Sequence, residues 1–197
     1  MKNILLILNF LVFATISCSA QNTMSLEDAA IYPEQPDGRM LPPNTTYLKD
    51  INNSLNKYVG TWRGNLNGKK YEYNFIKKVN DGSVDGKVRR DRLVGRLRIT
   101  DSNGNILYNT FTEPDDNNTN FFGKNFQPDL KAYMIYFVGN SIGCAEYGDV
   151  YLFVQPTTPN QMYLIMIPDN DITKEGDCPA GFQPTIPYQK TITLTKQ

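Results

Sequence analysis

A series of segments with period-two hydrophobicity constrains the fold of this chain more than any other feature. Thr61 to Leu66 and Lys70 to Val79 flank Asn67-Gly68, and an Asn-Gly pair between alternating segments is typical of a two-residue β-hairpin loop. The other segments with a strand-like pattern are Arg92 to Thr100, Ile106 to Phe111, Ala132 to Val138, Val150 to Gln155, Gln161 to Ile167 and Thr191 to Thr195. Helical segments are too few to cover a parallel sheet. The sequence therefore predicts an all-β fold, an antiparallel barrel of about eight strands, with a two-sheet β-sandwich as the alternative.

One short helix is expected at the start of the folded domain. Leu48, Ile51, Leu55 and Tyr58 recur at helical spacing, which predicts a helix over 45–58 that ends at Gly60. The preceding residues, 21–44, contain four prolines and many polar residues but no periodic apolar pattern. We therefore expect a disordered tether over 21–44 and one folded domain over 45–197.

The first twenty residues have the features of an export signal. A basic residue precedes an apolar run from Ile4 to Ile16, and the small residues of Cys18-Ser19-Ala20 follow. This pattern predicts a secretory signal peptide over 1–20, and the run is too short to span a bilayer as a helix. Two forms of processing stay open, because the chain could be cut before Gln21 or lipidated at Cys18, where residues 15–18 resemble a bacterial lipobox. The predicted location is periplasmic or extracellular, or the outer membrane as a lipoprotein.

Composition excludes several classes of protein. The chain has 20 basic and 20 acidic residues, so no global field favours a nucleic-acid partner. It has no histidine, which excludes Ser-His-Asp and Cys-His catalysis and histidine-ligated zinc. Outside the signal the cysteines are Cys144 and Cys178, and in an exported chain such a pair predicts a disulfide. The alternative, a reactive thiol, would lack a histidine to activate it.

No motif predicts a catalytic residue, a metal site or a cofactor. Asp81-x-Ser83-x-Asp85-Gly86 resembles the first half of a calcium loop, but Arg92 stands where the bidentate acidic ligand belongs, which favours an ordinary turn. A carboxylate-based hydrolase could draw on Glu72, Glu113, Glu146 or Asp149. Nothing in the sequence holds two of them at the ~5 or ~9 Å that glycoside hydrolysis requires.

A basic stripe accompanies the third predicted strand and consists of Lys87, Arg89, Arg90, Arg92, Arg96 and Arg98. Such a stripe would suit a polyanion such as an acidic glycan. Its arginines, however, alternate with Leu93 and Leu97, as they would on the solvent face of a half-buried strand. Because neighbouring carboxylates can neutralise these charges, the pattern favours a solvated face.

Aromatic residues on the inward faces of the predicted strands offer a candidate ligand site. They are Tyr71, Tyr73, Phe75, Tyr133 and Phe137. These side chains could line a cavity in the barrel, but an eight-stranded barrel can equally fill its interior with its own side chains. Both interpretations stay open at the level of the sequence.

The segment Gly60-Thr61-Trp62, placed behind a predicted helix, resembles the Gly-x-Trp opening of lipocalin-like (calycin) barrels. That resemblance implies that Trp62 plugs the closed end of a barrel. A wider pattern resembles an uncharacterised family of secreted Bacteroidota proteins, and it consists of Ile31-Tyr32-Pro33, Tyr47 to Asn53, Tyr58 to Trp62, Asp91 to Gly95, Asn109-Thr110, Cys178 and Leu194 to Gln197. This second resemblance implies export and a small barrel-like domain, and it brings no assigned activity and no functional residues.

The leading hypothesis for function is a non-enzymatic binding module of the cell envelope that takes a small apolar or amphipathic ligand in the barrel mouth. It rests on the inward aromatic residues and on the missing catalytic groups. The alternative is a structural or interaction protein with a filled core, and a carboxylate-based hydrolase ranks last. The sequence predicts no transmembrane span, and it leaves the oligomeric state open.

Overall fold

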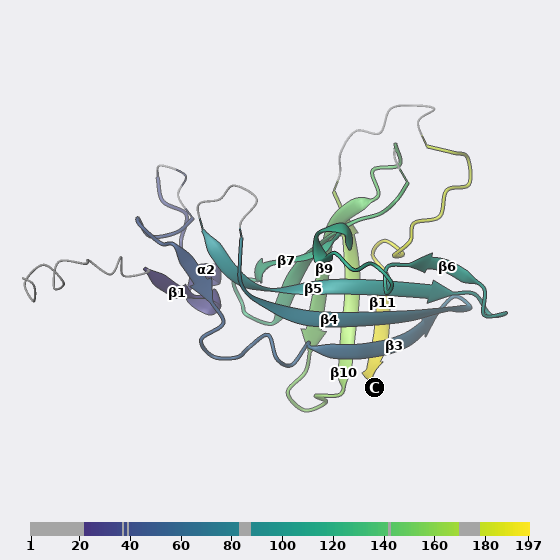
Figure 1. Ribbon diagram of the computed structural model, residues 1–197, viewed down its shortest axis with the longest axis horizontal. Coiled ribbons are helices and arrows are strands. Elements are labelled where there is room, and N and C mark those ends of the chain that lie inside the picture. Colours follow the sequence, from purple (N-terminus) through teal and green to yellow (C-terminus); the bar gives the residue numbers. More distant parts are fainter. Residues whose placement is uncertain (1–21, 37, 39, 83–87, 142, 170–177) are drawn as a thin grey trace, which may run out of the picture.

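Eight antiparallel strands close a barrel in the computed structural model, which describes residues 22–36, 38, 40–82, 88–141, 143–169 and 178–197. Their order around the barrel is β5 (Arg89–Thr100), β4 (Lys69–Asp81), β3 (Gly60–Leu66), β11 (Thr191–Lys196), β10 (Gln161–Pro168), β9 (Tyr147–Val154), β8 (Ala132–Val138) and β7 (Phe121–Phe126). A pairing of Val94 with Phe122 joins β7 back to β5. In Figure 1, β3–β5 run across the view in front of β9–β11, which cross behind them. The structure confirms the predicted all-β, lipocalin-like barrel.

Strand β7 closes the barrel, and sequence analysis did not identify it. The predicted strand Ile106 to Phe111 is shorter in the structure, where β6 (Ile106–Asn109) pairs with β5 outside the closed ring. The pattern of β7 is hidden because its pairing with β8 shifts register between Gly123 and Phe126. A register shift breaks the period-two alternation on which the prediction of strands depends.

The helix predicted over 45–58 is wrong. That segment forms the short strand β2 (Tyr47–Lys49) followed by turns, and Ile51 is 53% exposed although helical spacing would bury it. The Asp50 carboxylate accepts hydrogen bonds from the backbone N–H of Leu55, and Asn53 adopts a positive φ of 57°. Side-chain bonds of this kind satisfy the backbone in a turn and so compete with a helix.

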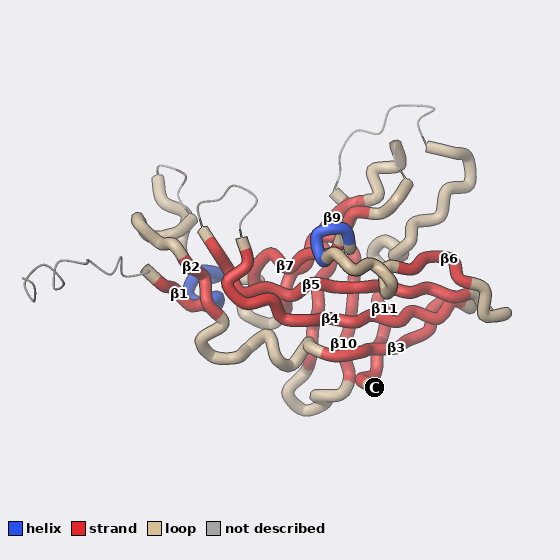
Figure 2. Tube along the Cα trace, in the orientation of Figure 1, coloured by secondary structure: helices blue, strands red, loops and turns tan. Residues whose placement is uncertain are grey.

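The helix that the structure does contain lies in the stretch expected to be a disordered tether. Strand β1 (Thr23–Ser25) and helix α2 (Leu26–Ile31) precede β2, and both strands extend the sheet in parallel beside the start of β5. The Ser25 side chain caps α2 by accepting the N–H of Asp28 at 2.9 Å, and Leu26 packs into the core. Figure 2 shows this N-terminal unit at one end of the barrel. No helix in the described part of the chain is long and apolar enough to cross a membrane.

Glycines in the barrel wall allow aromatic rings to lie close to the backbone. A Cβ atom on Gly95 would lie 2.4 Å from Cδ1 of Phe121 and 2.9 Å from Cε1 of Phe75. A Cβ atom on Gly123 would lie 2.3 Å from the hydroxyl oxygen of Tyr133. All three distances are well below ordinary van der Waals contact, so the large rings occupy the space that the glycines leave.

Candidate functional site

The five residues expected to line a ligand cavity form the centre of the core. Tyr71, Tyr73, Phe75, Tyr133 and Phe137 are at most 1% exposed. The ring centroids of Phe75 and Phe121 are 5.7 Å apart, and those of Phe121 and Phe137 are 5.3 Å apart in an edge-to-face arrangement. Burial raises the pKa of Tyr73 well above its ordinary value, as expected of a phenol in an apolar interior. This packing favours a barrel filled by its own side chains.

Trp62, the expected plug of the barrel, is also fully buried. Its indole N–H donates to the backbone carbonyl of Tyr58 at 2.7 Å, and the ammonium of Lys196 lies 5.2 Å from its ring centroid. A buried indole needs a hydrogen-bond partner, and the turn before β3 supplies one. Trp62 therefore fastens the 51–58 turns to the first strand of the barrel.

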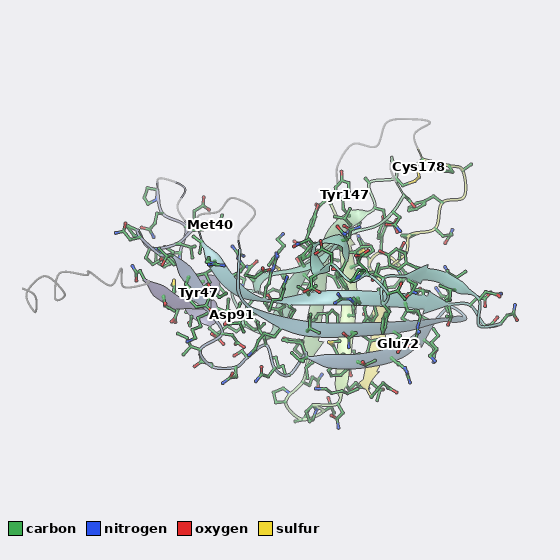
Figure 3. All side chains as sticks on the ribbon, viewed as in Figure 1. Met40, Tyr47, Glu72, Asp91, Tyr147 and Cys178 are labelled. Atoms are coloured by element: carbon green, nitrogen blue, oxygen red, sulfur yellow. A yellow bond between two sulfur atoms is a disulfide. The ribbon has the colours of Figure 1, made fainter. Side chains whose placement is uncertain are left out.

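The outer face of β3–β5 carries charged side chains that neutralise one another. Glu72, labelled in Figure 3, accepts hydrogen bonds from Arg98 at 2.6 Å and from Arg63 at 3.0 Å. Burial alone would raise the pKa of Glu72, but the hydrogen bonds from Arg98 and Arg63 hold it below its usual value. Both oxygens of this buried carboxylate are thus engaged by guanidinium groups.

Much of the basic stripe is paired in the same way. Asp116 accepts from Arg96 at 2.7 Å and lies 3.2 Å from the ammonium of Lys78, while Arg92 pairs with Asp81 at 2.5 Å. These contacts support the interpretation of the stripe as a solvated, charge-balanced face. Lys87, Asp85 and Ser83 lie outside the described residues, as does Cys18. The turn expected in place of a calcium loop and the two forms of processing near Cys18 therefore stay predictions.

The carboxylates considered for a hydrolase lie in different parts of the fold. Glu113 lies in the loop between β6 and β7, whereas Asp149 on β9 pairs with Lys124 at 2.8 Å. Glu146 is 3% exposed and accepts the backbone N–H groups of Thr185 and, at 3.3 Å, of Ser141. Glu113 accepts the backbone N–H of Asp115 at 3.0 Å, so each of these carboxylates has its own structural partner, and the fold does not pair one with another.

The disulfide between Cys144 and Cys178 is present, with Cα atoms 4.6 Å apart, as the sequence predicts. Figure 3 shows Cys178 beyond the end of the barrel at which Tyr147 begins β9. Glu146, two residues from the bridge, holds the later part of the same segment through the N–H of Thr185. The disulfide and this carboxylate together fasten residues 178–187 to the connection between β8 and β9.

A buried polar cluster that sequence analysis missed anchors the N-terminal unit. Asp91 accepts hydrogen bonds from the hydroxyl of Tyr47 at 2.5 Å, from the N–H of Asp50 at 3.0 Å and from the N–H of Asn80 at 2.8 Å. Figure 3 places Tyr47 and Asp91 together at that end of the molecule. The Lys77 ammonium lies 3.0 Å from Asp50 and completes the cluster. The two carboxylates of this cluster are bound by the protein's own backbone N–H groups and side chains, which assigns the cluster a structural role.

The outer face of β8–β10 is chemically unlike that of β3–β5. Most of its outward side chains are apolar or aromatic, and they are Ala132, Met134, Tyr136, Val138, Tyr147, Tyr151, Phe153, Tyr163, Ile165 and Ile167. The outward polar residues of these strands are Asp149 and Gln161. Strand register makes them one surface, since Phe153 lies between Ala132 and Tyr163, and Tyr151 lies between Met134 and Ile165. The rings of Phe153 and Tyr163 stack with centroids 6.2 Å apart.

A groove of about 450 Å³ lies on this surface. Its floor consists of Ala132, Tyr151, Phe153, Ile165 and Ile167. Its polar side consists of Gln127, Asp129 and Lys131 from the turn between β7 and β8. We call this the outer groove. The uninterrupted apolar run Val150 to Val154 could have indicated this apolar outer surface, because a strand with one solvated face normally alternates apolar and polar residues.

Comparison with known proteins identifies a family but no activity. The model of a family of unknown function, DUF6705, matches residues 1–153, and the chain belongs to this family. Neither the curated proteins nor the solved structures contain a match to the chain.

Proposed function

We propose that this DUF6705 protein is an exported, non-enzymatic binding protein that takes a small amphipathic ligand in the outer groove. The observation that carries the proposal is the apolar and aromatic floor of that groove. The solvated face of an antiparallel strand ordinarily carries polar residues instead. The proposed ligand site differs from the barrel mouth expected from the sequence, because the inward aromatic residues pack against one another.

The size and composition of the outer groove suit a small molecule. Its volume of about 450 Å³ lies within the roughly 300–1,000 Å³ of typical ligand sites. Tyr151 and Phe153 offer ring surface with few rotatable bonds, so they lose little entropy when a ligand packs against them.

The polar side of the groove gives the ligand its amphipathic character. Asp129 and Lys131 form an exposed ion pair at 3.6 Å, and such a pair is weak enough to exchange its partner for groups of a ligand. Asp129 also accepts the N–H of Lys131 at 3.0 Å, which fixes the turn that carries both residues. We infer a ligand with an apolar body over Phe153 and a polar end at this turn.

Export and the absence of catalysis are parts of the same proposal. The Cys144–Cys178 disulfide suits an oxidising compartment outside the cytoplasm. The candidate carboxylates are each engaged by a cation or by backbone N–H groups, which supports binding rather than hydrolysis. A purely structural protein is the competing function, and the filled core would serve it equally well.

The proposal is tested with Nile red, a neutral and mainly apolar dye whose fluorescence reports an apolar site. We expect saturable binding to the purified protein and a dissociation constant about tenfold or more higher in Phe153→Ser, since burying a phenylalanine contributes roughly 1.5–3 kcal/mol. Tyr136→Ser is the matched control, because Tyr136 is an outward aromatic residue of the same sheet that does not line the groove.

Native mass spectrometry of protein purified from its own host complements the dye. A bound small molecule that Phe153→Ser loses and Tyr136→Ser retains supports the proposal and reveals the ligand's mass. Equal dye binding by the Phe153→Ser variant and the unmodified protein contradicts it. Dye binding that is absent from all three proteins favours the structural alternative.

A further inference from the structure

We propose a second ligand site, for a small organic anion, on the charged outer face between β4 and β5. A cavity of about 340 Å³ lies there, lined by Lys70, Glu72, Arg98, Thr100, Gly104 and Ile106. We call it the Lys70–Arg98 pocket. It is separate from the outer groove, because β4 and β5 are not neighbours of β9 or β10 in the barrel.

Strand register places the two cations at opposite corners of one group of four outward residues. Lys70 pairs with Thr100 and Glu72 pairs with Arg98, so these four residues form a square on the outward face. Lys70 has no ion-pair partner among the residues that the structure describes, in contrast to Arg92 and Arg96 farther along the stripe. Because Arg63 and Arg98 share the single carboxylate of Glu72, positive charge is in excess at this end of the charged face.

The guanidinium of Arg98 is held in place before any ligand binds. Its Nη2 donates to Glu72 at 2.6 Å, and its centre lies 4.9 Å from the ring centroid of Phe111. Glu72 binds Arg63 with its other oxygen, so two guanidinium groups share one carboxylate, and Lys70 lies two residues away on the same face of β4. A fixed guanidinium with remaining N–H groups loses little conformational freedom on meeting a carboxylate or phosphate group.

The opposite wall is apolar and rigid. It is formed by Gly104 and Ile106 at the start of β6. Asp101 braces the preceding turn by accepting the N–H groups of Asn103 at 2.9 Å and Asn105 at 2.8 Å, so its carboxylate is engaged within the turn. The cavity is larger than an inorganic ion needs, and Ile106 offers a surface for an aliphatic part. The structure therefore fits an anionic group at Lys70 and Arg98 with a short apolar chain against Ile106.

The test uses butyrate, its neutral analogue butyramide and inorganic phosphate, each titrated into the purified protein at low salt. Chemical shifts of the Gly104 amide and the Arg98 side-chain N–H report binding. We expect saturable shifts with butyrate and none with butyramide. Lys70→Gln is expected to weaken butyrate binding about tenfold, the usual effect of one charged hydrogen bond. Lys69→Gln is the matched control, since this substitution removes the same charge from the adjacent residue, which does not line the pocket.

Ile106→Ser tests the contribution of the apolar wall to binding. Because Ile106 is 62% exposed, its replacement leaves the core intact. It should weaken butyrate binding several-fold and leave phosphate binding unchanged. The site is refuted by an absence of saturable shifts with butyrate, by equal butyrate affinity in the Lys70→Gln variant, or by equal weakening in the Lys69→Gln variant. Phosphate binding as tight as that of butyrate, together with no effect of Ile106→Ser, refutes the assignment of an organic anion.

Discussion

Replacing Gly95 by alanine tests directly whether the barrel interior is filled. Gly95 lacks a positive φ, so a backbone effect alone would make the substitution stabilising by about 0.4–1 kcal/mol, because alanine restricts the unfolded chain. The added Cβ, however, would lie 2.4 Å from Phe121 and 2.9 Å from Phe75, both fully enclosed in the core. Overpacking of this kind costs about 1–3 kcal/mol. We therefore expect the free energy of unfolding to fall, and the sign alone distinguishes a filled interior from an open one.

Urea denaturation followed by the fluorescence of Trp62, the chain's one tryptophan, measures this change. Gly82→Ala is the matched control, since a Cβ there meets no heavy atom within 4 Å. A second substitution, Phe121→Leu, removes the clashing ring, so Gly95→Ala should be less destabilising in that background. A Gly95→Ala protein as stable as the unmodified one would refute the reasoning and reopen the interior as a ligand site.

Three further predictions concern the anchors of the fold. Asp91→Ala should lower the free energy of unfolding by about 3–5 kcal/mol, because it leaves the Tyr47 hydroxyl and two backbone N–H groups without their acceptor. Urea denaturation measures this change, and a decrease below ~1 kcal/mol would contradict the prediction. Cys144 and Cys178 are 34 residues apart in the sequence, so Cys144→Ser should lower the free energy of unfolding by about 3–4 kcal/mol. Treatment of the native protein with an alkylating agent before reduction should leave its intact mass unchanged, and a mass increase would contradict the bridge. Burial and the hydrogen bond to Asp91 raise the pKa of Tyr47 to about 12, so the folded chain keeps a proton that the unfolded chain loses near 10.0, and stability should fall as pH rises between these values. Urea titrations across that range, with Tyr47→Phe showing a shallower decline, check this last point.

The barrel could be predicted because its signals are local. The Asn67-Gly68 turn and the alternation of Tyr71, Tyr73 and Phe75 with polar residues are fixed by adjacent positions in the chain, and the structure retains them. The pairing of Cys144 with Cys178 followed from composition alone. Strand β7 was missed because Gly123 and the register shift near it break the local period, and it becomes a strand through its partners β5 and β8.

Two features that the sequence did not settle depend in part on contacts between distant residues. Apolar spacing over 45–58 predicts a helix, but Asp91, far along the chain, binds the N–H of Asp50 and favours turns instead. The state of the barrel interior likewise depends on the fit of Phe121 against Gly95, two residues on different strands. Periodicity identifies which residues point inward, but it contains no information on whether their volumes leave a void.

The two outer faces of the barrel have different relations to solvent, and this difference favours a role in binding over a purely structural one. On β3–β5, Glu72 and Asp116 pair with arginines, as on a charged face in contact with water. On β9 and β10, Tyr151, Phe153 and Ile165 form an apolar floor, and the charged pair Asp129–Lys131 lies only at its side. The filled core needs no help from these outward residues, so stability alone does not account for them. A protein under no selection for contact on that face would gain solubility by placing charges there. A ligand in the outer groove would cover this apolar floor, and for this reason we propose binding rather than a purely structural role.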